Sequence, residues 1–168
     1  MKKSLALLLL ASFAVPAFAQ TRPGTDHASL AAECEQLIKD TNTLANGTLC
    51  YRESPEASSY FNDLSMILLF NHPKVDQCRQ QARQSPNQSH TARPTNADLG
   101  KLCAESRVER ARLRREIETY LDSKMAEYAA AEAPKRGISA TELLHQTRAK
   151  ETERRAKVDA AVRRIDGR

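Results

Sequence analysis

Four cysteines constrain the fold of this chain more than any other feature of its sequence. They are Cys34, Cys50, Cys78 and Cys103, and no two of them are spaced as Cys-x-x-Cys. This spacing argues against a thioredoxin-like redox centre and against haem attachment. In an exported chain, an even number of cysteines indicates structural disulfides. We therefore expect two disulfide bonds, provided that the chain leaves the cytoplasm.

The first nineteen residues predict that it does. Two lysines precede a short apolar run, residues 4–15, which is followed by the small-residue pattern Ala17-Phe18-Ala19. This is the layout of a secretory signal peptide, here residues 1–19, cleaved after Ala19. The apolar run is too short for a membrane-spanning helix, which needs about 20 residues. We expect a soluble protein of a bacterial periplasm, with an uncleaved membrane anchor as the less favoured alternative.

The composition favours helices. The chain has 168 residues, only five glycines and no tryptophan, and alanine, leucine, glutamate and arginine dominate. These are strong helix formers, and the length suits one domain. We predict an all-α fold with a small disulfide-linked helical bundle over residues 20–84 and a polar linker over 85–96. A long, charged antiparallel helical hairpin over 97–168 follows, clipped to the bundle by a disulfide.

Three helices are expected in the bundle, over residues 28–42, 55–70 and 74–84. Asn46-Gly47 is a turn signal and is expected to follow the end of the first helix. The second helix has a clear start, because Ser54 can cap it and Pro55 suits its first position. Residues 66–70, with the sequence MILLF, are apolar all round. We expect them to be the most buried segment, with an exposed partner-binding patch as the alternative.

Two helices are expected in the hairpin, over residues 97–133 and 139–165. Ser139 and Glu142 form a capping box, and Ile138 can pack against Leu143 as a hydrophobic staple. The middle of the last helix, residues 148–157, is almost wholly polar. Such a helix packs lightly, so it either projects from the bundle or awaits a partner.

Helix lengths give a preference among the three disulfide pairings. At about 1.5 Å per residue, a second helix of this length separates Cys50 from Cys78 by about 25 Å. By the same rise per residue, Cys34 and Cys78 lie at nearly the same height along the bundle axis if the first three helices run up, down and up. This favours Cys34–Cys78 with Cys50–Cys103. The sequential pairing, Cys34–Cys50 with Cys78–Cys103, stays open and is nearly as well supported.

Residues 107–116, RVERARLRRE, contain five arginines. Nucleic acid is a disfavoured ligand for an exported chain, so this charge needs another use. Glutamates three or four residues away can pair with arginines on a helix, which favours a salt-bridged outer face. The alternative is a docking surface for an acidic partner. Its candidate partner-binding residues are Arg107, Arg110, Arg112, Arg114, Arg115, Arg154 and Arg155.

No catalytic or cofactor motif stands out in the sequence. There is no Gly-rich phosphate loop, no G-x-S-x-G and no H-E-x-x-H, and the four histidines are scattered singly. We therefore expect no enzyme activity, no cofactor and no metal site.

The leading hypothesis is a non-enzymatic periplasmic adaptor that binds another periplasmic or envelope protein. A natural setting is an envelope assembly such as a secretion or conjugation apparatus. One alternative is an inhibitor or immunity protein directed against a cell-wall hydrolase. The other is an envelope-surface-associating or chaperone-like protein, which contacts the membrane surface without inserting into it.

Overall fold

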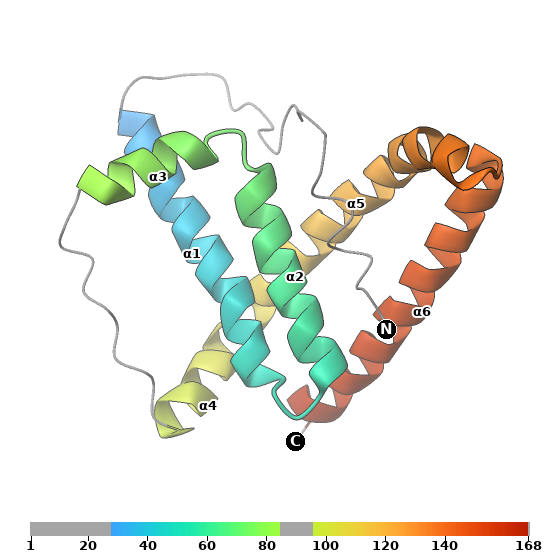
Figure 1. Cartoon of the computed structure of the whole chain (residues 1–168). Helices are drawn as coiled ribbons and strands as arrows, with labels where there is room; N and C mark the ends of the chain where they lie inside the picture. The colour runs from blue at the N-terminus through green and yellow to red at the C-terminus, as the bar shows by residue number, and fades with distance from the viewer. Residues whose placement is uncertain (1–27, 85–95, 168) are drawn as a thin grey trace.

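The structure, a computed structural model, describes residues 28–84 and 96–167. Its helices are α1 (Ala28–Cys50), α2 (Pro55–Asn71), α3 (Val75–Gln84), α4 (Asn96–Glu105), α5 (Arg107–Arg136) and α6 (Ala140–Asp166) (Figure 1). These residues contain no strand, so the all-α prediction is confirmed. None of these helices is both long enough and apolar enough to cross a membrane. The expected signal peptide lies outside the described residues, as does the expected linker apart from Asn96.

The pairing of α1 with α2 makes α1 longer than the sequence predicts. The expected turn at Asn46-Gly47 is wrong, because α1 continues to Cys50. Leu44 is fully buried. A Cβ atom on Gly47 would lie 2.7 Å from the Cγ atom of Phe61 in α2, so only glycine permits this approach of the two helices. Tertiary packing keeps the segment helical and overrides its local preference for a turn.

The start of α2 agrees with its predicted cap, but its apolar end is only partly buried. The Ser54 side chain accepts a hydrogen bond from the backbone N–H of Ala57 at 3.3 Å, and Pro55 takes the first helical position. Within residues 66–70, Met66 and Phe70 remain 39% and 44% exposed. The expectation that this is the most buried segment is wrong, because helical periodicity turns these two side chains outward.

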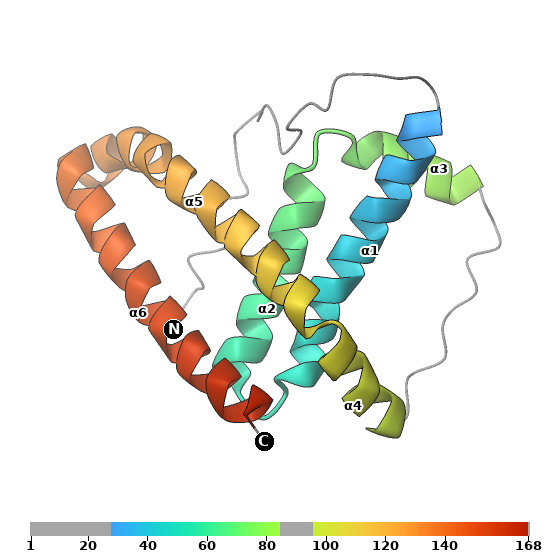
Figure 2. The ribbon, with the colours of Figure 1, turned by 180° about the vertical axis from the view of Figure 1, so that it is seen from behind.

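Two disulfides hold the two ends of α1. Cys34–Cys78 joins its N-terminal part to α3, which lies across that end of the α1–α2 pair (Figures 1 and 2). Cys50–Cys103 joins its last residue to α4. This is the crossed pairing that the helix lengths favour. The bonds fix α3 and α4 against one helix, although 44 and 53 residues of chain separate the paired cysteines.

The long helix expected over residues 97–133 is interrupted. α4 ends at Glu105 and α5 begins at Arg107, with Ser106 between them. The Ser106 hydroxyl donates a hydrogen bond to the backbone carbonyl of Leu102 at 2.6 Å. Such back-bonding by serine is known to bend helices. The prediction of a single helix is therefore wrong at this point.

A tight turn joins α5 to α6. Gly137 ends α5 with φ 66°, a left-handed conformation that glycine adopts without strain. The Ser139 side chain then caps α6 by accepting a hydrogen bond from the backbone N–H of Glu142 at 3.1 Å, as predicted. Around this turn lies a small hydrophobic cluster, here called the apex cluster, made of Tyr128, Ala129, Ala133 and Leu143, with Ile138 and Leu144 beside it.

The other end of the hairpin belongs to the main core. From the apex, α6 returns to the turn between α1 and α2 (Figure 1). There the Tyr51 hydroxyl donates a hydrogen bond to the Asp166 carboxylate at 3.2 Å. The main core combines α1 and α2 with both hairpin helices, and its hairpin members are Leu113, Ile117, Val158 and Ala161. The hairpin base therefore packs on the bundle, and only its apex has a separate cluster.

Candidate functional site

The seven arginines predicted to bind a partner differ in their exposure. Arg107 and Arg115 are exposed, and a docking role for them stays a prediction. Arg110 is only 1% exposed and is not accessible to a partner. The other four are partly buried and form ion pairs within the chain: Arg112, Arg114, Arg154 and Arg155.

Arg110 fastens the α4–α5 junction to the turn after α1. Its guanidinium donates hydrogen bonds to the Ser106 hydroxyl at 2.6 Å, the Cys103 carbonyl at 3.2 Å and the Tyr51 hydroxyl at 3.3 Å. It also lies 5.1 Å from the centre of the Tyr51 ring. Its Nε atom is buried without a hydrogen-bond partner. This side chain therefore holds the region around Cys103 together and has a structural role.

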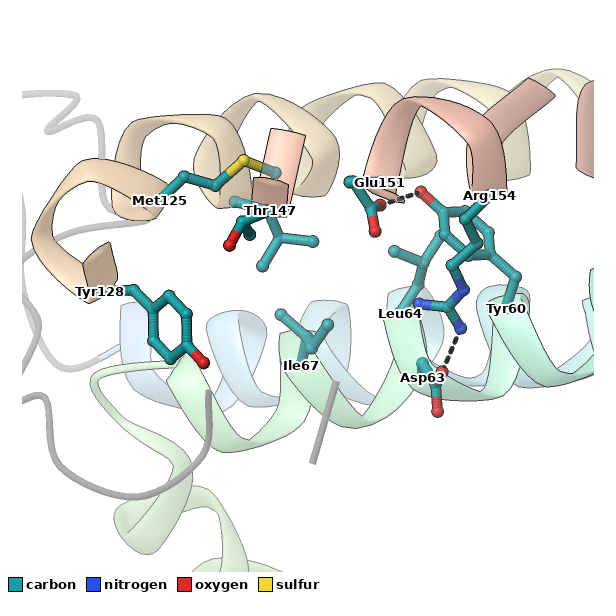
Figure 3. Close-up of a pocket in the computed structure, with 10 residues that line it drawn as sticks. Tyr60, Asp63, Leu64, Ile67, Met125, Tyr128, Thr147, Glu151 and Arg154 are labelled. Carbon is teal, nitrogen blue, oxygen red and sulfur yellow. Dashed lines mark hydrogen bonds and ion pairs between the residues drawn. The ribbon is translucent and has the colours of Figure 1, made fainter. Parts of the chain in front are cut away.

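Tyr60 of α2 is the centre of a second polar network. Its hydroxyl donates to the Glu118 carboxylate at 2.7 Å. It also lies 3.4 Å from the carboxylate of Glu151 (Figure 3). The guanidinium carbons of Arg154 and Arg114 lie 4.7 and 5.4 Å from its ring centre. Burial raises the pKa of Tyr60, and the hydrogen bond to Glu118 raises it further. The hydroxyl therefore stays protonated and acts as a donor at neutral pH.

Ion pairs around this tyrosine tie α6 to the two helices beside it. Arg114 pairs with Glu118 and Asp159, Arg154 with Asp63, and Arg155 with Asp122 and Glu151. Arg112 pairs within α5, with Glu109 and Glu116, as the sequence spacing predicts. Much of the positive charge of the arginine-rich segments is thus engaged by carboxylates of the chain itself.

A small cavity lies beside the tyrosine network. Leu64 and Ile67 of α2 line it together with Met125, Tyr128 and Thr147 of the hairpin (Figure 3). Its volume is about 30 Å³. This is two to three times the roughly 10–15 Å³ that one water molecule needs. In this conformation the cavity therefore has room for about two water molecules.

A larger hollow, here called the groove, lies between α1, the α2–α3 corner and α5. Its volume is about 250 Å³. Four buried apolar residues line its floor: Leu37, Leu68, Leu113 and Ile117. The Cys34–Cys78 bond fastens α3 beside the groove, and Cys50–Cys103 fastens the segment that leads into α5. The walls of the groove are therefore held by covalent links as well as by packing.

Charged and polar side chains surround the groove. Glu33 of α1 forms an ion pair with Lys74, which directly precedes α3. Asp40 accepts a hydrogen bond from Gln36 at 2.6 Å. Burial raises the pKa of Asp40, and the Gln36 hydrogen bond partly offsets this effect. Burial lowers the pKa of His72, so its imidazole is neutral at pH 7.

The described residues do not assemble a metal-binding cluster. Within residues 28–84 and 96–167, no group of three or more histidine, cysteine, aspartate or glutamate side chains is placed to hold a metal ion. All four cysteines are in disulfides, so they offer no free thiolate.

The chain matches no protein-family model, no curated protein and no solved structure. The groove could not be predicted from the sequence, in which the arginine-rich segments are the more prominent feature. Leu37 and Asp40 lie one helical turn apart, so a local apolar and acidic face is visible in the sequence. That this face lies opposite Leu113 and Glu116 depends on how α1 packs against α5.

Proposed function

We propose that this chain is an exported, non-enzymatic periplasmic protein that binds another envelope protein through the groove. The observation that carries the proposal is a disulfide-framed groove with an apolar floor between α1 and α5. Disulfides are compatible with an oxidising compartment outside the cytoplasm. The chain would act as an adaptor in an envelope assembly such as a secretion or conjugation apparatus.

The size of the groove suits part of a polypeptide. Its volume of about 250 Å³ lies close to the lower end of the roughly 300–1,000 Å³ of typical ligand pockets. A space of this size suits one or two apolar side chains of a docked segment. Because the walls are already fixed, little conformational entropy is lost on binding, which favours affinity.

The exposed arginines favour a second candidate function, which is association with an anionic envelope surface. Arg107, Arg115, Arg163 and Arg164 are all exposed. This candidate predicts that the protein sediments with anionic vesicles at low salt and is released at high salt. Sedimentation that does not depend on salt, or none at all, would remove it.

The adaptor proposal is tested by crosslinking the tagged protein in intact cells and comparing two charge reversals. Glu116→Lys changes the rim of the groove, whereas Glu127→Lys changes the hairpin apex. The two glutamates are well matched, because each side chain is 50% exposed and pairs with a basic residue of α5. We expect a discrete adduct with an envelope protein that is lost in Glu116→Lys and kept in Glu127→Lys. An adduct that survives both changes would contradict binding through the groove.

A further inference from the structure

The cations at the groove are already engaged by carboxylates of the chain itself. Lys74 pairs with Glu33 on one side. On the other side Arg112 pairs with both Glu109 and Glu116, and this hydrogen bonding lowers the pKa of Glu109. With Lys39 near Glu109, three cations therefore face three carboxylates here, before Asp40 is considered. The rim has no surplus positive charge to offer an acidic ligand.

Asp40 adds a fourth carboxylate, whose hydrogen bond comes from a neutral group, Gln36. Burial is the main effect that disfavours its ionised form; the charge of Arg112 favours that form, and the charges of Glu109 and Glu116 oppose it. His72 is neutral at pH 7, and Lys39 adds its charge beside Glu109. Asp40 is thus a partly buried acid beside an apolar floor, and a cation from outside would stabilise its ionised form.

We propose that the groove binds a cationic amphipathic segment of the partner protein. Apolar side chains of that segment occupy the floor formed by Leu37, Leu68, Leu113 and Ile117. A lysine or arginine side chain of the segment forms an ion pair with Asp40. Burial of the apolar side chains supplies affinity, and the charge-assisted contact supplies orientation and selectivity. The inference rests on the proposed function and specifies the chemistry of the partner.

The test uses two synthetic amphipathic peptides and the disulfide-bonded protein. One peptide consists of leucine and lysine in a helical pattern, and the other has glutamate at every lysine position. Binding is measured by fluorescence anisotropy. We expect the lysine peptide to bind and the glutamate peptide to fail. Asp40→Asn should weaken binding by about tenfold or more, because a charged hydrogen bond is lost. Asp40→Lys should abolish binding, and the control Glu127→Gln should leave it unchanged.

Amide resonances place the bound peptide on the protein. We expect the lysine peptide to shift the signals of Leu37, Asp40 and Leu113. Equal binding of both peptides, or full binding to Asp40→Lys, would overturn the inference. Shifts confined to the apex cluster would overturn it too. If crosslinking captures a partner through the groove but its docked segment lacks lysine and arginine, the adaptor proposal stands and this inference fails.

Discussion

Replacing Gly47 with alanine tests the packing of α1 on α2. Alanine is favoured over glycine within a helix by about 1 kcal/mol. The added methyl group would lie 2.7, 2.8 and 2.9 Å from three atoms of Phe61. Phe61 is 2% exposed and is stacked on Tyr51 with ring centres 4.9 Å apart, so it has little room to move. Overpacking of this kind costs about 1–3 kcal/mol.

The steric cost should exceed the gain in helix propensity. We expect Gly47→Ala to lower the free energy of unfolding by about 1–2 kcal/mol, taking the upper part of the overpacking range. Urea unfolding of the oxidised protein, followed by far-ultraviolet circular dichroism, measures this change. Gly100→Ala in α4 is the matched control, because a Cβ there meets nothing within 4 Å. It should raise stability by about 0.5–1 kcal/mol.

The two glycine substitutions are therefore expected to have opposite signs. Phe61→Leu should also reduce the penalty of Gly47→Ala, because the smaller side chain relieves the clash. If Gly47→Ala stabilises the protein as much as Gly100→Ala does, the close approach of α1 and α2 is refuted.

Three further predictions concern other parts of the molecule. Replacing Cys50 and Cys103 with serine should lower the free energy of unfolding by about 4 kcal/mol in the loop-entropy treatment, because 53 residues separate them. An unchanged urea midpoint would show that the bond does little to constrain the unfolded chain. Arg110→Ala should lower the free energy of unfolding by about 3 kcal/mol. Arg110→Met should lower it clearly less, because methionine fills the same space and carries no charge that must be paired. Equal losses of stability in the two variants would refute this explanation. Asp40→Asn should stabilise the protein at neutral pH, because its carboxyl has a raised pKa and its ionised form is disfavoured by folding. This advantage should shrink as the pH falls through the raised pKa, and an advantage that grows instead would contradict the assignment.

Local rules predicted features whose cause lies within a few residues. The Ser139 cap and the pairing of Arg112 within α5 follow from spacings of three or four residues. The crossed disulfides were favoured by comparing helix rise and helix length in a bundle whose first three helices run up, down and up. The structure has this pairing, although α3 lies across the end of the α1–α2 pair.

Features that depend on contacts between distant segments could not be predicted in this way. The turn signal at Asn46-Gly47 was overridden because Gly47 packs on Phe61, which no local pattern indicates. Arg114 pairs with Asp159, 45 residues further along the chain, so the sequence could not show that this arginine is engaged. The groove is hidden for the same reason, since its walls come from α1, the α2–α3 corner and α5.

The most direct test of the central claim compares two surfaces in intact cells. A photocrosslinking amino acid is placed at Gln36 on the rim of the groove, at Arg115 on the exposed arginine face, or at Ala130 near the apex as a control. The account predicts one discrete envelope-protein adduct from Gln36 that is lost in the Asp40→Lys background, and none from Ala130. An adduct from Arg115 without one from Gln36 would contradict it and assign partner binding to the arginines.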